Sequence, residues 1–377
     1  MTGMAGRRPA LVWAVNLAAL VLVVLWTIPT LGLFVSSFRD RDQITQSGWW
    51  AALSGAEQTG FVRTGTGDEA TRRDGFYVIE GNVLTGDETL VGWGTRARQP
   101  AAHKPGDSVQ LADGQTLSVQ ENGDYRLSSA RPFQMKRGQR IFTTTHQPPR
   151  FTTRNYRRVI AAEGLGRAFM NTLTVTIPAT VIPILIAAFA AYALAWMRFP
   201  GRALLTAFVV GLLVVPLQIA LIPLLRLHNE IGIGKGYLGI WLAHTGFGLP
   251  LAIYLLRNYM AGLPREVIES ARVDGATEFQ IFRRIILPLS FPALASFAIF
   301  QFLWVWNDLL VATVFLGNTS DQLVMTGLLR ELMGSKGGEW EVLATSAFIS
   351  IAVPLLVFFA MQKYLVRGLL AGSVKGG

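Results

Sequence analysis

The chain has 377 residues, a formal net charge of +10, 51% hydrophobic residues and 15% charged residues, a balance typical of a polytopic membrane protein. There is no cysteine, which excludes disulfides and thiolate metal sites, and the four histidines show no metal-ligand spacing. The arginines cluster at the ends of apolar runs, which is typical of helix orientation in a membrane and argues against nucleic-acid binding.

Six apolar segments are long enough to cross a hydrocarbon core of roughly 30 Å, which needs about 20 residues. They lie near residues 11–35, 169–196, 203–225, 237–257, 289–316 and 342–364. The first is longer than the apolar part of a secretory signal and no small-residue cleavage site follows it, so we expect it to stay attached. The pattern predicts an all-α polytopic membrane protein with six transmembrane helices.

Lysine and arginine are more frequent on one predicted side of the membrane than on the other. Arg7 and Arg8 precede the first span, and the connection 257–288 is rich in arginine, whereas the short outer connections hold few basic residues. Because cytoplasmic loops carry an excess of Lys and Arg, we expect the N-terminus, the C-terminal tail 365–377 and this connection to be cytoplasmic.

The long connection 38–168 is polar and contains short strand-like runs between turn signals. Asp113-Gly114 and Asn122-Gly123 are hairpin-type turns, which predicts a small β-domain over about 74–145, outside the membrane. This domain either recognises a partner or packs on the outer face. No carboxylate pair or Ser/His/Asp set in it suggests catalysis, and we expect neither catalytic residues nor a metal site in this chain.

A second polar segment, residues 264–288, separates the fourth and fifth apolar runs and has the pattern of two short helices. Pro264 suits the first turn of a helix, and Gly275 can end that helix in the left-handed conformation. Thr277 followed by Gln280 predicts a capping box for the second helix. These signals alone are also compatible with an amphipathic connector that rests on the membrane.

The two short helices each have an apolar face. We expect one face to hold Val267, Ile268 and Ala271, and the second to hold Phe279, Phe282 and Ile286. Leu287-Pro288 is expected to stop the second helix before the fifth span begins.

This segment resembles the cytoplasmic EAA loop of the permease subunits of binding-protein-dependent ABC importers. The matching positions are Glu269, Ala271, Asp274, Gly275, Ala276, Ile286, Leu287 and Pro288. Ser270 is the one departure, because the motif usually has Ala there. The resemblance implies that the first short helix docks into a groove on an ATPase subunit. The coupling residues would then be Glu266, Glu269, Ser270, Ala271, Asp274, Gly275, Ala276, Leu287 and Pro288.

In such a permease, Glu269 would make a charged contact with the ATPase, and Gly275 would let the docking helix project. Rigid movement of the ATPase pair would then tilt the attached spans. The chain has no phosphate-binding loop of its own, because Gly234-Lys235 is followed by Gly236 and not by Ser or Thr. We therefore expect no cofactor in this chain, with ATP and Mg bound by the partner ATPase.

The resemblance extends over most of 1–38 and 155–377 to the smaller permease of maltose-type carbohydrate importers. The segment Trp304, Trp306, Asn307 and Asp308 resembles one typical of these sugar permeases. An Asp inside a span is costly unless it faces water or a partner, so Asp308 is either a pathway group or a helix-end cap facing the headgroups. Further polar candidates for a sugar path are Gln218, His244 and Gln301.

Two other segments also follow the maltose-type permeases. The C-terminal residues Gly372, Ser373, Val374, Lys375 and Gly376 resemble a tail that reaches between the two ATPase subunits, although a frayed end is the alternative. The outer connection 317–341 corresponds to a loop that dips into the substrate-binding protein, and its glycines allow mobility.

The long outer loop is what we expect of alpha-glucoside permeases, so the resemblance implies a permease in the bacterial inner membrane that imports such a disaccharide. The implied partners are a second permease subunit in a heterodimer, two ATPase subunits, an extracytoplasmic sugar-binding protein and the lipid bilayer. Alternative cargoes are a polyol, glycerol-phosphate or another oligosaccharide. Alternative classes are a secondary transporter and a membrane receptor or scaffold built around the β-domain.

Overall fold

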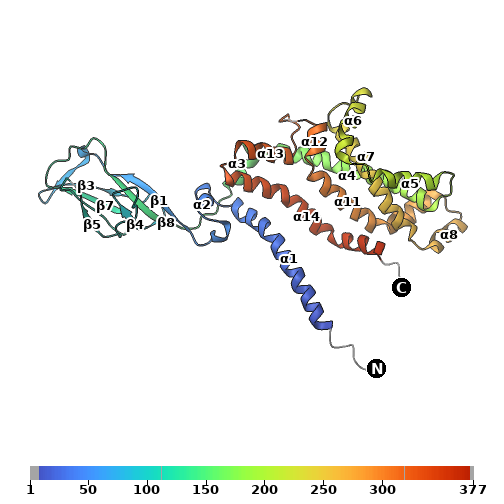
Figure 1. Ribbon diagram of the computed structural model, residues 1–377, viewed down its shortest axis with the longest axis horizontal. Helices are drawn as coiled ribbons and strands as arrows, with labels where there is room; N and C mark the ends of the chain where they lie inside the picture. The colour runs from blue at the N-terminus through green and yellow to red at the C-terminus, as the bar shows by residue number, and fades with distance from the viewer. Residues whose placement is uncertain (1–7, 112, 318, 374–377) are drawn as a thin grey trace. The chain divides into compact units, whose positions relative to one another are not determined.

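The computed structural model describes residues 8–111, 113–317 and 319–373. It divides into two compact units, one of Met1–Asn155 with Glu339–Ala344 and one of Tyr156–Gly338 with Thr345–Gly377. Figure 1 shows the elements of both.

The first unit begins with a long apolar helix, α1 (Arg8–Ser37). The span Ala10–Ser37 is apolar enough to cross a membrane, and the side chains of its most apolar stretch are exposed, as expected of a helix that faces lipid. Two short helical segments follow, α2 (Arg41–Gln46) and η1 (Trp49–Ala51). The ring of Trp49 packs against Gly32 of α1, where a side chain would collide with it.

The rest of this unit is an all-antiparallel β-domain of two sheets. Its elements are β1 (Ala56–Arg63), η2 (Gly67–Glu69), β2 (Thr71–Arg73), β3 (Phe76–Asn82), β4 (Thr89–Gly94), β5 (Ser108–Gln110), β6 (Thr116–Val119), β7 (Asp124–Ser129) and β8 (Arg140–Gln147). One sheet has the order β1-β8-β4 and the other β2-β3-β7-β6-β5. The strands begin at Ala56, earlier than the expected start near 74, because β1 pairs with β8 residue for residue.

The core of the β-domain surrounds Trp93, which is fully buried among Ile79, Leu117 and Leu127. The Trp93 Nε1 donates to the Lys104 carbonyl at 3.0 Å, so the indole is buried with its polar atom paired. Both expected hairpin turns are present, with Gly114 and Gly123 at positive φ. These turns join β5 to β6 and β6 to β7.

The second unit is helical, and α3 (Arg154–Ala161) leads into it. Its further elements are α4 (Leu165–Trp196), α5 (Arg202–Leu212), α6 (Leu217–Glu230), α7 (Tyr237–Ala261), α8 (Arg265–Val273), α9 (Glu278–Ile281), η3 (Phe282–Ile286), α10 (Leu287–Leu289), α11 (Phe291–Trp306), α12 (Leu310–Phe315), α13 (Met325–Ser335) and α14 (Trp340–Ser373). The helices α4, α7 and α11 pack on one another and form its centre.

The spans fall into two kinds in the described residues. Four continuous helices are long and apolar enough to cross a membrane: Ala10–Ser37, Leu165–Trp196, Tyr237–Ala261 and Trp340–Tyr364. Two further pairs, α5 with α6 and α9–α10 with α11, meet that test only together and are bent by 108° and 69°. The count reaches six if each bent pair is one span.

The expected third span, 203–225, is broken into two helices, α5 and α6. The break lies between Leu212 and Leu217, and Pro216 stands in it. Proline has no N–H to donate and disfavours a helical residue before it, so the helix cannot run through. The expected fifth span, 289–316, is also interrupted, because α11 ends at Trp306 and α12 begins at Leu310.

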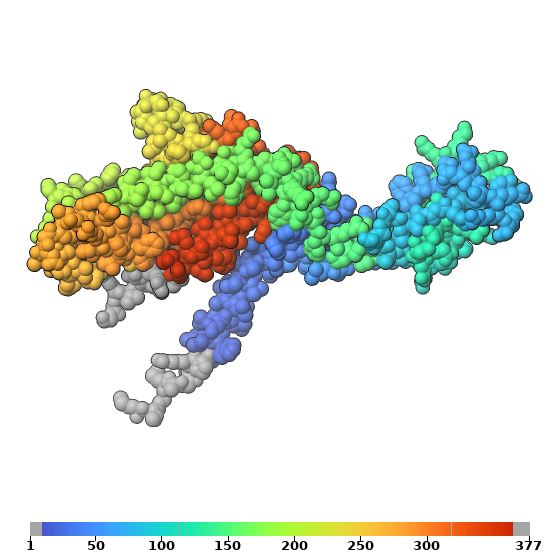
Figure 2. Space-filling view, turned by 180° about the vertical axis from the view of Figure 1, so that it is seen from behind, coloured from blue at the N-terminus to red at the C-terminus, as the bar shows by residue number. Residues whose placement is uncertain are grey.

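Two apolar cores hold the helical unit together. One joins α4, α7 and α11 to the segment α8–η3, and the other joins α4, α7, α6 and α12. Figure 2 shows α8–η3, coloured orange, at one end of the helical unit. That segment is therefore attached to three long helices by apolar packing.

The outer connection 317–341 contains a helix that we did not predict. This is α13, whose Gly327 is buried inside the helix. Asn171 of α4 donates to the carbonyls of Asp321 and Leu323, and Arg167 forms a 2.7 Å ion pair with Asp321. These bonds fasten the start of the connection to α4.

Candidate coupling site and membrane path

The helix α8 presents one apolar face to the helical unit and a polar face to solvent. Ile268 and Ala271 are buried in the core with α4, α7 and α11, as expected, whereas Val267 is 40% exposed. Glu266 lies in the first turn, where a negative charge favours the helix dipole. The helix is thus fastened by its buried face and leaves its acidic face free.

The end of α8 is a Schellman motif centred on Gly275. Gly275 has φ of +80°, its N–H donates to the Arg272 carbonyl, and the Ala276 N–H donates to the Ala271 carbonyl. These two bonds satisfy carbonyls that the end of a helix leaves unpaired. The left-handed conformation that we predicted for Gly275 is confirmed.

The second short helix begins with the predicted capping box. The Gln280 N–H donates to the Thr277 hydroxyl, and the Thr277 N–H donates to the Gln280 side chain at 2.8 Å. Both bonds are local, so four residues of sequence were enough to predict them.

Leu287-Pro288 does not stop this helix, in contrast to our prediction. The chain passes from α9 through η3, which is one π-helical turn, into α10, and the bend lies at Ser290. Pro288 cannot donate to the carbonyl four residues before it, and the wider π turn accommodates that loss. Leu287 is half-buried and Pro288 exposed, and both line an apolar cavity of about 470 Å³.

The expected coupling residues divide into exposed and buried groups. Glu266, Glu269, Ser270, Asp274 and Gly275 are exposed on one side of the segment, whereas Ala271 is buried and Ala276 half-buried. Ala271 therefore supports the helix from behind and does not face a partner.

The segment has two exposed apolar side chains whose exposure we did not predict. Val273 is 87% exposed, and Phe279, which we placed on the apolar face of the second helix, is 60% exposed. Phe282 and Ile286 are buried as predicted. A helical projection could have suggested Val273, because it follows the buried Ile268 by five residues and points elsewhere.

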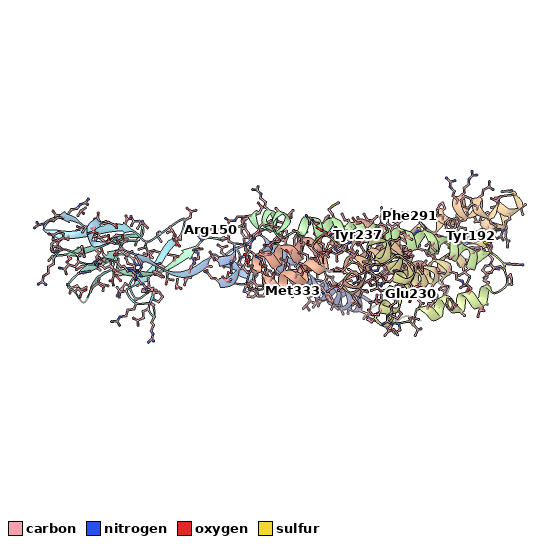
Figure 3. The ribbon with its side chains drawn as sticks, turned by 90° about the horizontal axis from the view of Figure 1, so that it is seen from above. Arg150, Tyr192, Glu230, Tyr237, Phe291 and Met333 are labelled. Carbon is pink, nitrogen blue, oxygen red and sulfur yellow. The ribbon has the colours of Figure 1, made fainter. Side chains whose placement is uncertain are left out.

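A polar network that we did not predict links the segment to α4. The Tyr192 hydroxyl donates to Glu278 Oε2, and Arg272 Nε donates to Glu278 Oε1 at 3.1 Å. Tyr192 is nearly buried, and Figure 3 shows it at the end of the helical unit that carries α8. The sequence offered one sign of this network, because Arg272 and Glu278 carry opposite charges on either side of the turn at Gly275.

An aromatic contact supports this network. The ring of Phe282 lies 4.6 Å from that of Phe189 and 5.3 Å from that of Tyr192, measured between centroids. The Trp196 indole, also on α4, donates to the Met260 carbonyl at 3.0 Å. The last turns of α4 are therefore held to α7 and to α8–η3 by polar and aromatic contacts.

The four expected path residues have different surroundings. Trp306 is buried, donates to the Ser350 carbonyl and stacks with Phe302, so it packs helices together and does not face a path. Asn307 is exposed and donates to the Leu303 carbonyl. Trp304 is 36% exposed and lies edge-on to the His244 ring.

Asp308 acts as a helix cap. Its Oδ2 accepts from the Ala312 N–H at 3.0 Å at the start of α12, and it lies 3.9 Å from His244 Nε2. The carboxylate is nearly buried, so the cap does not face the headgroups as the alternative supposed. A buried cap beside a histidine explains why an acidic residue is tolerated here.

Trp304 also lines a cavity of about 600 Å³ between the α5–α6 bend, α7 and α11. Gln301 lines the same cavity and donates to the Ala179 carbonyl at 3.0 Å. Gly248 leaves room for Gln301, because a Cβ atom at position 248 would lie 2.7 Å from the Gln301 Oε1. Gln218, by contrast, is exposed outside this lining. Small-molecule sites commonly have such a lining, an apolar wall with an aromatic ring and a few polar groups.

The predicted C-terminal contact residues lie only partly within the described part of the chain. Gly372 and Ser373 belong to α14, so they are helical, while Val374, Lys375 and Gly376 lie outside the described residues. Among the residues that the structure describes, no group of acidic or histidine side chains could hold a metal ion.

Comparisons with known proteins place these features in a wider group. The family model described as "Binding-protein-dependent transport system inner membrane component" matches residues 168–370, more than half of the chain. The alpha-glucoside transport system permease protein AglG of Rhizobium meliloti is 63% identical and covers 98% of this chain and 99% of its own length. The osmoprotective compounds uptake permease protein GgtD of Synechocystis sp. is 43% identical, with 96% and 91% covered. The trehalose transport system permease protein SugB of Mycobacterium tuberculosis is 34% identical, with 61% and 84% covered.

Proposed function

We propose, since this chain belongs to the family of binding-protein-dependent transport system inner membrane components, that it is the permease subunit of an ATP-driven importer for an alpha-glucoside. The observation that carries the mechanism is the construction of α8, which has an exposed acidic face and a buried face packed against the long helices. When a partner bound to the exposed face moves, such a helix moves with it and displaces the spans packed against its buried face.

The proposed mechanism begins with docking of α8 on an ATPase subunit. Glu269 makes the charged contact, and the exposed Val273 and Phe279 supply apolar contact area beside it. When the ATPase pair closes on ATP, α8–η3 moves as a body and carries α4 with it through the Tyr192–Glu278–Arg272 network. The cavity beside Trp304 then changes its access.

The assembly that this mechanism requires has several chains. A second permease forms a heterodimer with this one, two ATPase subunits bind ATP and Mg, and an extracytoplasmic binding protein delivers the sugar. Both termini lie in the cytoplasm, which agrees with the distribution of Lys and Arg. Residues 372–376 contact the ATPase pair.

The nature of the cargo rests on the relatives. The full-length similarity to an alpha-glucoside permease supports a disaccharide such as trehalose, sucrose or maltose. The similarity to a permease for osmoprotective compounds supports an osmoprotective solute as the second candidate. Competition for uptake by a panel of both classes, in the presence of the binding protein, distinguishes them.

The test of the coupling role is ATP-dependent uptake in vesicles that contain all subunits. Glu269→Ala is expected to lower uptake at least tenfold and to reduce co-purification of the ATPase, because a charged interface contact of this kind contributes about 1.5–3 kcal/mol. The matched control is Glu230→Ala, an exposed glutamate at the end of α6 (Figure 3). It is expected to leave uptake and co-purification unchanged.

Normal uptake with Glu269→Ala would reject the docking role. Deletion of residues 56–147, the whole β-domain from β1 to β8, is the companion experiment, because it addresses the receptor alternative. Loss of all function on that deletion, together with normal function of Glu269→Ala, would assign the activity to the β-domain.

Trp304 is expected to contribute to the sugar path. Trp304→Ala should raise the KM for uptake by about fivefold to tenfold with little change in maximal rate, since it removes an aromatic contact of about 1–1.5 kcal/mol. Trp241→Ala is the control, because Trp241 lies outside the cavity lining and donates to the Thr174 carbonyl. An equal KM in wild type and Trp304→Ala would remove Trp304 from the path.

A further inference from the structure

Arg39 is a buried cation that follows the end of α1. Its side chain is almost fully enclosed, since the residue is 2% exposed. Its Nη1 donates to the Ser47 carbonyl at 2.9 Å, and its Nη2 donates to the Gln43 carbonyl at 2.8 Å and to the Ser47 hydroxyl at 2.6 Å. All three acceptors are neutral.

Two of the five donors of this guanidinium remain available. The Nε is buried without a hydrogen-bond partner, and Nη1 makes one bond of the two it can make. Within the part of the chain that the structure describes, no carboxylate pairs with Arg39, and the neighbouring Asp40 pairs with Arg154 at 3.0 Å. Burial lowers the pKa of Arg39, yet a guanidinium stays charged at any physiological pH.

An uncompensated charge in such a place is costly, so a counter-ion is expected close to it. Arg39 lines a cavity of about 360 Å³, together with Ser36, Ser47 and the residues Trp49 and Trp340. All of these residues belong to the first unit. The cavity is far larger than one water needs, which is about 15 Å³, so it can hold a polyatomic anion.

The position of the cavity along the chain identifies the source of that anion. The apolar span ends at Ser37, and the cavity is lined from Ser36 onward, which places it at the depth of the lipid headgroups. Trp50 is 77% exposed and Leu53 is 82% exposed just beyond it, and exposed tryptophan at a span end is typical of the membrane interface. The anions concentrated at this depth are lipid phosphates.

We propose that the cavity at Arg39 binds the phosphate of an anionic phospholipid, with the charged guanidinium of Arg39 as its partner. Ser36 supplies a further hydroxyl at the wall, and the tryptophans cover the glycerol region. This site rests on α1 as a membrane span and does not depend on the importer function. It fixes the end of α1, and with it the start of the outer connection, at one depth in the bilayer.

The test is native mass spectrometry of the intact protein in detergent, titrated with phosphatidylglycerol, phosphatidylcholine or inorganic phosphate. Wild type is expected to retain phosphatidylglycerol at least tenfold better than Arg39→Gln. Arg41→Gln is the matched control, because Arg41 is exposed two residues further on and should bind like wild type. Arg39→Lys, which keeps the charge, is expected to retain part of the binding.

A variant that keeps Arg39 separates binding from folding. Thr45 is exposed and lines the cavity, so Thr45→Phe should block lipid retention while the chain stays folded. Equal phosphatidylglycerol binding by wild type, Arg39→Gln and Thr45→Phe would overturn the proposal. Displacement of the lipid by millimolar inorganic phosphate would leave a general anion site. Equal retention of phosphatidylcholine, which carries the phosphate without a net charge, would leave a phospholipid site that ignores headgroup charge. Either result would overturn the assignment to an anionic lipid.

Discussion

Gly275→Val is expected to reduce ATP-dependent uptake at least tenfold and to weaken co-purification of the ATPase subunits. Gly275 has φ of +80°, and the left-handed region costs an L-residue roughly 1–2 kcal/mol, more when it is β-branched. The alternative to that strain is loss of the two bonds that end α8, each contributing about 0.5–1.5 kcal/mol. Either route reorients the docking helix, because Gly275 and Ala276 set the turn after it.

The control for this experiment is Gly201→Val. Gly201 also has φ of +80°, begins α5, and likewise has open space around the position of an added side chain. The strain of the two substitutions is therefore matched, whereas only Gly275 lies between α8 and α9. Equal uptake by the two variants, whether both normal or both reduced, would show that the turn at Gly275 has no special part in coupling.

Tyr192→Phe is expected to uncouple ATP hydrolysis from uptake, with about a fivefold fall in sugar molecules imported per ATP. The substitution removes one hydroxyl that bonds Glu278 and leaves the Phe282 ring contact in place. The stability cost is small, about 0.5–1.5 kcal/mol, so the protein still inserts and binds the ATPase. Motion of α8–η3 then reaches α4 less completely, because its polar link is gone.

Tyr237→Phe provides the matched comparison for this variant. The Tyr237 hydroxyl donates to Asn171 on the same helix α4, at 3.0 Å, and Figure 3 shows both tyrosines. We expect a similar loss of stability in detergent, with no change in sugar imported per ATP. Uptake and hydrolysis measured together in the same vesicles decide the question. An unchanged ratio in Tyr192→Phe would mean that apolar packing alone transmits the motion.

The acidic partner of Tyr192 offers a second variant. Glu278→Gln keeps the size of the side chain and removes its charge, so it weakens the bond to Arg272 while one to Tyr192 can persist. If the network transmits the motion, the ratio of uptake to ATP hydrolysis in Glu278→Gln should lie between the ratios of wild type and Tyr192→Phe.

The sequence by itself determined the features that depend on near neighbours in the chain. Long apolar runs become helices because a backbone in lipid must satisfy its own hydrogen bonds, which is why four predicted spans correspond to continuous helices. The turn at the left-handed Gly275 and the capping box of Thr277 with Gln280 are both held by hydrogen bonds between residues at most five apart in the sequence. The hairpin turns at Gly114 and Gly123 belong to the same class.

The tertiary structure decided which apolar and polar side chains meet. Periodicity could not show that Phe282 is buried against α4 while Phe279 is exposed, because that depends on where α4 lies. Trp304 and Trp306 are two residues apart, yet one lines a cavity and the other packs against α14. The partners of these side chains are distant in sequence, and only the packing of helices brings them together.

The same reason explains the residues that sequence analysis overlooked. Glu278 meets Tyr192 across 86 positions of sequence, and the cavity at Arg39 is lined by Trp340, which follows it by some 300 residues. Burial of Arg39 without a carboxylate depends on which groups the fold leaves beside it. No spacing along the chain encodes that outcome, whereas the apolar span that brings Arg39 to the headgroup depth is readable from residues 10–37 alone.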